Sequence, residues 1–212
     1  MTLQLFWAGL LASETLALIV YRLRSRERMY PLFFYYMIVD VILSLLMFGI
    51  YRVAGQSAYT QAQLIWGPFM QCALMLPCAE AIYRMHREVP YSLTEAVYGA
   101  VLPCVGALGL VWWIGHPPDW FATSRQAMLS FKAGASGLSG VVVFSFAMIH
   151  WADCRRSCRE RCISTRHAML LSAYLSIYAI AYWLVGRVPF GSVDLPMLIA
   201  CTVCFIVWCF IW

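Results

Sequence analysis

The chain has 212 residues, of which 63% are hydrophobic and only 12% are charged. Soluble domains carry about 25% charged residues, so much of the apolar surface of this chain must face a solvent other than water, and a lipid bilayer is such a solvent. The net charge of +5 comes almost wholly from arginines in short clusters between long apolar stretches. This pattern argues against a nucleic-acid-binding protein and favours an integral membrane protein.

Seven apolar segments, each near the length of about 20 residues that crosses a bilayer, predict an all-α protein with seven transmembrane helices. The connections are short, so we expect residues 1–212 to form a single transmembrane domain. The first segment lacks a basic stretch before it and is followed directly by Arg22, so we do not expect a cleaved signal peptide. We place the segments at residues 3–21, 32–52, 63–83, 93–114, 127–149, 168–186 and 192–212.

The arginines predict the orientation of these helices. Eleven of them lie in or beside the first, third and fifth connections between segments, whereas only Arg52, Arg125 and Arg187 lie around the even-numbered connections. Basic residues stay in the cytoplasm, so we expect the N-terminus outside and the C-terminus inside the cell. The eleven are Arg22, Arg24, Arg26, Arg28, Arg84, Arg87, Arg155, Arg156, Arg159, Arg161 and Arg166.

Ionisable residues inside the apolar segments are the best functional signal, because each charge in hydrocarbon costs at least a few kcal/mol unless it is paired or hydrated. Glu14 and Asp40 each lie about eight residues, or about 12 Å, from the inner end of their segments. We therefore expect the two carboxyl groups at similar depth on adjacent helices. Lys132 is the only lysine and lies well inside the fifth segment. These three residues are candidates for an intramembrane ion, proton or ligand site, although structural hydrogen bonds between helices are the commoner use of such residues.

His150, Cys154, Cys158 and Cys162 occur at intervals of four in the stretch HWADCRRSCRERCISTRH, residues 150–167. On one helix they would extend over about 18 Å, whereas zinc binds sulfur at about 2.3 Å, so the four cannot share one ion. Neighbouring arginines would also repel a cation. We therefore favour a reduced, basic cytoplasmic loop and predict no metal site. Lipidation or redox sensitivity of the cysteines is the first alternative, and a metal held by an adjacent pair is the second.

The stretch KAGASGLSG at residues 132–140 contains three regularly spaced glycines, Gly134, Gly137 and Gly140. Small residues allow helix backbones to approach closely in lipid. We expect this stripe to form either an internal helix-packing contact or an interface with a partner protein.

Three tyrosines follow one another at intervals of four in the sixth segment, at Tyr174, Tyr178 and Tyr182. Residues at this spacing lie on one face of a helix. Packing between helices is the expected use of this stripe, and the wall of a ligand cavity is the alternative.

Three aromatic-rich stretches carry a resemblance that covers most of the chain. They are PLFFYYMIVDVILSLLMFGIYR (31–52), AEAIYRMHREVPYSL (79–93) and LLSAYLSIYAIAYWL (170–184). Together they resemble an uncharacterised family of small seven-helix membrane proteins of acidobacteria-like bacteria. The resemblance implies a seven-helix fold and a bacterial source, and it implies no activity.

The sequence contains no nucleophile elbow, phosphate-binding loop or H-E-x-x-H pair, so we predict no enzymatic activity and assign no cofactor. The short connections and the glycine stripe favour an accessory or scaffolding subunit of a larger membrane complex, with the lipid bilayer and other membrane subunits as partners. The alternative is a small proton- or ion-coupled transporter or channel that uses the intramembrane carboxylates.

Overall fold

The computed structural model describes residues 2–24, 26–88, 124–154, 162–185 and 193–211. Throughout these ranges the chain is helical and contains no strand, which confirms the predicted all-α class. The α-helices are α1 (Thr2–Leu23), α2 (Pro31–Glu88), α4 (Ser124–Cys154), α5 (Cys162–Val185) and α6 (Asp194–Ile211), and η1 (Arg26–Arg28) is a 3-10 turn.

Four helical segments are long and apolar enough to cross a bilayer: Pro31–Gln63, Ile65–Arg87, Leu129–Ala152 and Ile163–Val185. A shorter apolar helix covers Leu195–Phe210. These segments support a membrane location. The predicted segment at 93–114 lies outside the described residues.

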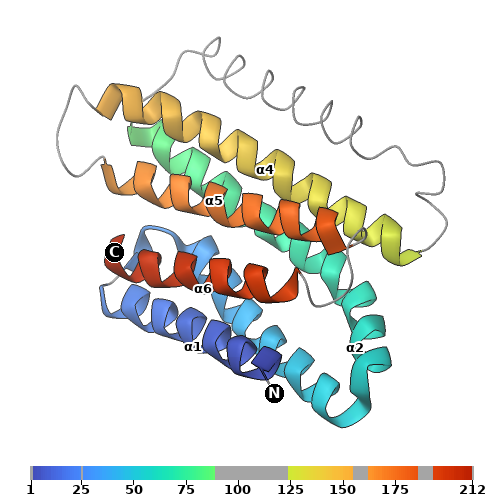
Figure 1. Ribbon diagram of the computed structural model, residues 1–212. Helices are drawn as coiled ribbons and strands as arrows, with labels where there is room; N and C mark the ends of the chain where they lie inside the picture. The colour runs from blue at the N-terminus through green and yellow to red at the C-terminus, as the bar shows by residue number, and fades with distance from the viewer. Residues whose placement is uncertain (1, 25, 89–123, 155–161, 186–192, 212) are drawn as a thin grey trace.

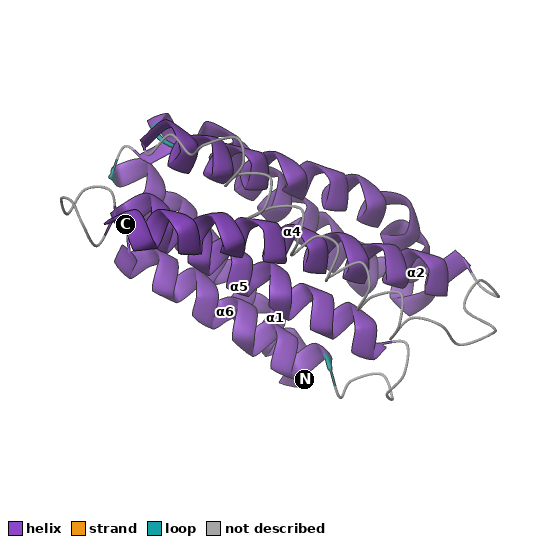
Figure 2. Ribbon diagram, turned by 90° about the horizontal axis from the view of Figure 1, so that it is seen from above, coloured by secondary structure: helices purple, strands orange, loops and turns teal. Residues whose placement is uncertain are grey.

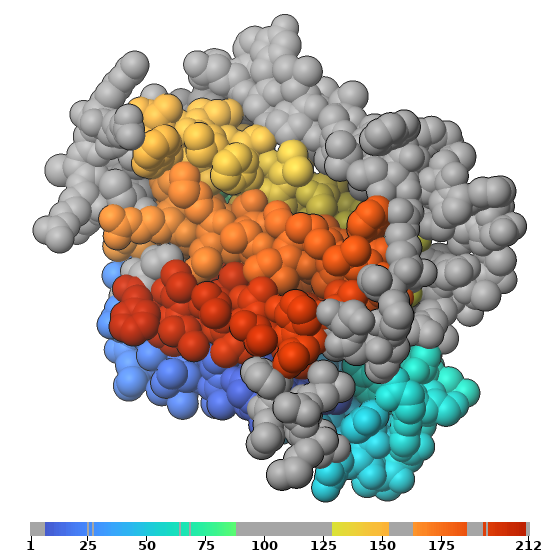
Figure 3. All heavy atoms as spheres, viewed as in Figure 1, coloured from blue at the N-terminus to red at the C-terminus, as the bar shows by residue number. Residues whose placement is uncertain are grey.

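Helices α4 and α5 form the most extensive helix pair, and α1 packs against α6. Helix α2 contacts α4, α5 and α1, so it joins the two pairs (Figures 1 and 2). In the space-filling view α6 lies between α1 and α5 (Figure 3). One bundle therefore contains all five α-helices.

Helix α2 reverses direction at Gly55, where the backbone has φ 81° and ψ −174° (Figure 1). Only glycine adopts this conformation without strain, because it has no Cβ. The reversal divides α2 into a first arm, residues 31–54, and a second arm, residues 56–88. The arms contain the predicted segments 32–52 and 63–83, but the helix also includes residues 53–62, which we had placed in a connection.

The N-terminus of α2 is capped by Glu80 from the second arm. The Leu32 N–H donates to Oε1 of Glu80 at 3.2 Å, and the Phe33 N–H donates to Oε2 at 2.9 Å. Pro31 has no N–H, and the Phe34 N–H already bonds the Tyr30 carbonyl oxygen at 3.1 Å. All the donors of the first turn are thus accounted for, as a helix end away from water requires.

A buried aromatic cluster, Tyr30, Phe33, His167 and Trp208, fills one end of the bundle. The ring centroids of Tyr30 and His167 are 4.4 Å apart, and those of Phe33 and Trp208 are 5.1 Å apart. The Trp208 indole N–H donates to Nδ1 of His167 at 3.3 Å. Because η1 and the end of the second arm also lie here, we call this the arginine end, and we call the opposite end the Gly55 end.

The glycine stripe lies at the α4–α5 contact. The Ser172 hydroxyl donates to the Gly140 carbonyl oxygen at 2.7 Å. A Cβ added to Gly140 would lie 3.2 Å from the Leu175 Cβ, whereas one added to Gly137 would lie 3.5 Å from the Ala179 Cβ. Gly137 and Gly140 therefore serve internal packing, and Gly134 is half-buried further along the same helix.

We expect Glu80→Leu to lower the free energy of unfolding by about 2–4 kcal/mol, because both capped N–H groups lose their acceptor in a site away from water. Glu80→Gln keeps one acceptor oxygen and should cost about 1–2 kcal/mol. Thermal or denaturant unfolding in detergent, followed by circular dichroism, measures both. The matched control is Glu14→Gln, since Oε2 of this buried carboxyl has no hydrogen-bond partner among the described residues. Equal stability of Glu80→Leu and the unsubstituted protein would show that Glu80 is not the cap.

Gly140→Ala should destabilise the bundle by about 1–3 kcal/mol, since the new methyl group would press α5 away from α4. Gly137→Ala provides the control. Its methyl group would lie at an ordinary van der Waals distance from the Ala179 Cβ, and alanine has a higher helix propensity than glycine. The same unfolding measurement compares the two variants. The packing described above is wrong if Gly137→Ala proves the more harmful substitution.

Candidate functional site

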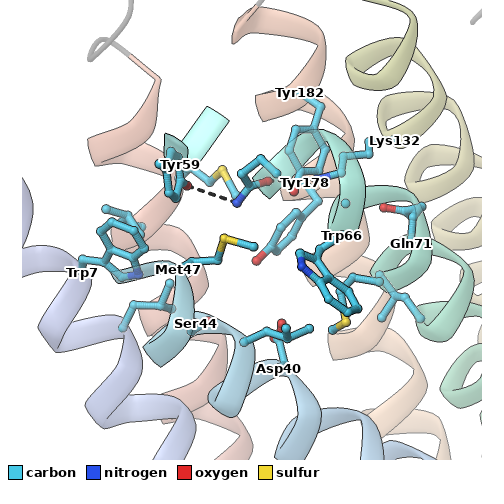
Figure 4. A pocket seen from close by; sticks show the side chains of 18 of the residues that line it. Trp7, Asp40, Ser44, Met47, Tyr59, Trp66, Gln71, Lys132, Tyr178 and Tyr182 are labelled. Atoms are coloured by element: carbon cyan, nitrogen blue, oxygen red, sulfur yellow. Dashed lines mark hydrogen bonds between the residues drawn. The ribbon is translucent and has the colours of Figure 1, made fainter. Parts of the chain in front are cut away.

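A cavity of about 360 Å³ lies between α1, the two arms of α2, α4, α5 and α6 (Figure 4). Its volume falls within the range of about 300–1,000 Å³ that small-molecule sites occupy. The wall combines aromatic rings with a few polar and charged groups. Those that matter most for its chemistry are Asp40, Gln63, Trp66, Lys132, Tyr178 and Tyr182.

Each arm of α2 contributes one helical stripe to the wall. On the first arm, Tyr36, Asp40, Ser44, Met47 and Tyr51 recur at intervals of three or four residues. Residues at this spacing share one helix face. The second arm contributes a corresponding stripe that begins at the turn and runs inward: Gln56, Tyr59, Gln63, Gly67, Met70, Gln71 and Leu74.

The cavity extends from the Gly55 end toward the middle of the bundle. Gln56 lies beside the turn at Gly55, whereas Asp40 lies eleven positions before Tyr51, or about 16 Å along the first arm. Residues nearer the arginine end, such as Phe33 and Trp208, are packed in the aromatic cluster. The cavity is thus confined to the half of the bundle that ends at Gly55.

Asp40 lies at the inner part of the cavity, with its side chain directed toward the space between the rings (Figure 4). Its carboxylate forms no hydrogen bond or ion pair with the other described residues; the one charge of opposite sign that acts on it there is that of Lys132. An ionised carboxylate offers about four acceptor positions. Asp40 therefore presents unused acceptors to whatever occupies the cavity.

Lys132 projects from α4 and is held at its tip. Its ammonium group donates to Oε1 of Gln63 at 3.3 Å and lies 4.8 Å from the ring centre of Tyr182. Gln63 is itself oriented by its amide N–H, which donates to the Tyr59 hydroxyl at 3.1 Å (Figure 4). An ammonium group has three donors, so one bond to Gln63 leaves two for a ligand.

Asp40 and Lys132 do not form an ion pair, although the charge of each acts on the other. Two opposite charges in apolar surroundings gain most from direct contact, which offsets part of their desolvation. Here the helices hold them apart across a shared cavity. The structure therefore brings together two of the three ionisable residues that the sequence singled out.

Glu14, the third of these residues, is not part of the cavity wall. It lies on the same face of α1 as the wall residues Trp7 and Leu10, one helical turn beyond Leu10, and it is buried. Its charge interacts with that of Asp40, and its Oε2 atom is buried without a hydrogen-bond partner among the described residues. Glu14 therefore acts on Asp40 through its charge, and it does not itself line the cavity.

The tyrosine stripe of α5 divides between the two expected uses. Tyr178 and Tyr182 line the cavity, whereas Tyr174 is buried against Phe205, with ring centroids 5.5 Å apart. The hydroxyl groups of Tyr174 and Tyr178 are 3.2 Å apart. Tyr178 and Tyr182 therefore fit the alternative interpretation, a cavity wall, whereas Tyr174 fits helix packing.

Only part of the cysteine-rich stretch, residues 150–167, belongs to the described residues. Cys158 lies outside the described residues, and so do the side chains of Cys154 and Cys162. His150 is buried and its Nδ1 atom lies 2.6 Å from the Thr165 hydroxyl, so it links α4 to α5. Within the described part of the chain, no three His, Cys, Asp or Glu side chains gather in a way that could hold a metal ion.

Several wall residues escaped the sequence analysis, above all Gln56, Gln63 and Gln71 on the second arm. Glutamine is a costly residue in hydrocarbon, and these three recur at intervals of seven and eight, close to two helical turns. Gln63 and Gln71 lie in the apolar segment 63–83 and were the available signal, whereas Gln56 lies in residues 53–62, between the predicted segments. Trp7 and Trp66 gave none, because aromatic residues near segment ends normally mark the membrane interface.

No protein family, curated protein or solved structure matches this chain. The resemblance to a seven-helix bacterial family stays a prediction for the same reason. The chemistry of the site is therefore interpreted from its own residues.

Proposed function

We propose that this protein is a small-solute transporter that binds its substrate in the cavity between α2, α4 and α5. The observation that carries the proposal is the pair of opposite charges, Asp40 and Lys132, held apart on the wall of one cavity. Charges within a membrane are costly and usually mark a substrate or ion pathway. A purely structural role would favour direct pairing, which the described side chains do not make.

The unequal ends of the bundle support transport over simple binding. The cavity lies toward the Gly55 end, while the rings of Tyr30, Phe33, His167 and Trp208 fill the arginine end. We therefore propose that a solute enters from the Gly55 end. A carrier that alternates between two sides needs one end closed while the other is accessible. This arrangement corresponds to one of those two states.

Glu14 is the residue that we assign to coupling with protons. It is buried, it has a carboxyl oxygen without a partner among the described residues, and its charge interacts with that of Asp40. Chains of carboxyl groups at such positions act as proton relays in pumps and transporters. Glu14 would exchange a proton while Asp40 contacts the substrate.

The accessory-subunit function stays a prediction alongside transport. Its support is the exposed apolar face of the first arm, which includes Tyr35, Val39, Ile42 and Leu46. Lipid covers such a face as readily as a partner subunit does. The charged cavity has no use in a scaffold, and it is the reason that we favour transport.

For the membrane arrangement we propose seven spans in a bacterial inner membrane, with the N-terminus and the Gly55 end outside. The distribution of the eleven arginines among the odd-numbered connections of the sequence supports this orientation. The cavity would then be accessible from the periplasm.

This orientation predicts that green fluorescent protein fused after Trp212 fluoresces in bacteria, since it folds in the cytoplasm. Alkaline phosphatase fused at the same position should be inactive, because it requires the oxidising periplasm. Fluorescence and phosphatase activity of the two fusions are the measurements. An active phosphatase with a dark fluorescent fusion would reverse the proposed orientation.

The transport proposal predicts that one class within a panel of amino acids, amines, sugars and carboxylic acids raises the melting temperature of the purified protein. Asp40→Asn and Lys132→Met should each weaken binding by about 30-fold or more, because loss of one partner in a buried charged contact costs at least about 2 kcal/mol. Uptake of the same solute into proteoliposomes should fall in parallel.

Ser145→Ala is the control, since its hydroxyl bonds the Val141 carbonyl oxygen within α4 and does not line the cavity. It should leave binding and uptake unchanged. The proposal fails if no solute stabilises the folded protein, or if both charge variants transport as well as the unsubstituted chain.

A further inference from the structure

We infer that the substrate is a zwitterion, a molecule with an ammonium group and a carboxylate on an apolar and preferably aromatic body. This inference rests on the proposed function and names its substrate class. Asp40 would bind the ammonium group and Lys132 the carboxylate, with the body between the rings.

The Asp40 side of the cavity suits an ammonium group. No described residue forms a hydrogen bond with the carboxylate, and the rings of Tyr36 and Tyr178 belong to the same wall. The faces of aromatic rings attract cations electrostatically. A cation here would therefore meet both a full negative charge and aromatic rings.

The Lys132 side suits a carboxylate. Gln63 and Tyr182 fix the ammonium group, and Tyr59 fixes Gln63. A side chain that is already ordered loses little entropy when a ligand binds, and it retains two donors for the carboxylate oxygens.

The space between these charges is apolar. Trp66, Met47 and Tyr178 project into it, with Asp40 on one side and Lys132 on another (Figure 4). These side chains can bury an aromatic or large aliphatic group but offer no further charge. Most of the affinity for the body would come from the area removed from water.

Charge balance separates a zwitterion from a singly charged ligand. A ligand with only a positive charge would be repelled by Lys132 and would leave this residue without a counter-charge. A ligand with only a negative charge would be repelled by Asp40 in the same way. A zwitterion matches both residues and adds no net charge to an apolar cavity, where each unmatched charge costs several kcal/mol. Glu14 lies off the wall, and the charge balance holds while its carboxyl group carries a proton.

The test compares ligands that share a phenyl ring and differ in charge. Phenylalanine carries both charges, phenethylamine only the ammonium group and 3-phenylpropionate only the carboxylate; 4-(aminomethyl)benzoate sets both charges further apart. Binding to the full-length protein in detergent is measured by calorimetry and by the shift in melting temperature. We expect one or both zwitterions to bind at least about 30-fold more tightly than either singly charged compound.

Two variants link that preference to the two residues. Asp40→Asn should remove most of the advantage of phenylalanine over 3-phenylpropionate, and Lys132→Met should remove most of its advantage over phenethylamine. Ser145→Ala should keep both preferences. If a variant does not fold, the four-ligand comparison on the unsubstituted protein still decides the matter.

Equal or tighter binding of a singly charged compound, or no binding of either zwitterion, overturns the inference. Transport of another solute class from the wider panel would then leave the proposed function standing. Zwitterion binding without uptake into proteoliposomes would instead support the substrate class and contradict transport.

Discussion

The bond between the Glu80 carboxylate and the first turn of α2 is the contact on which the arrangement of the bundle depends. A helix end that is packed inside the bundle needs acceptors for its first N–H groups from elsewhere in the chain. Glu80 supplies it from 47 residues beyond Phe33. With the two arms fixed to each other here and joined at Gly55, their inner faces are set opposite one another. The stripes that contain Asp40 and Gln63 then meet across the cavity.

The two ends of the bundle differ in how they are filled, and both arms of α2 contribute to this difference. At the arginine end, aromatic rings fill the space between α2, α5 and α6, and the Trp208 indole N–H donates to Nδ1 of His167. Toward Gly55 the wall carries glutamine, tyrosine and charged side chains around a cavity. A membrane interior tolerates such groups only if water or a ligand reaches them. The contrast between a packed aromatic end and a polar cavity is the reason that we propose a substrate pathway.

The sequence predicted the all-α class correctly, because long apolar stretches without strand patterning favour helices that cross a bilayer. Counting residues from the arginines also predicted Glu14 and Asp40 at similar depth, and in the structure the charges of these two residues interact. The rotation of each helix about its axis could not be predicted, so nothing in the sequence distinguished Asp40, which lines the cavity, from Glu14, which does not. The Glu80 cap had no local signature, because its partners Leu32 and Phe33 lie 48 and 47 residues away along the chain. Nor did anything in the sequence mark Gly55 as the site of a reversal within a continuous helix.

Access of water to the cavity from outside the cell is the central claim, and thiol labelling measures it most directly. Ser44 lines the cavity, whereas Ala168 is fully buried in α5. Intact cells expressing Ser44→Cys or Ala168→Cys are treated with a membrane-impermeant thiol reagent, and mass spectrometry locates the label, so the native cysteines do not interfere. We predict modification at position 44 and none at position 168. An unmodified Cys at position 44 in the folded protein would contradict an externally accessible cavity, and with it the proposed substrate path.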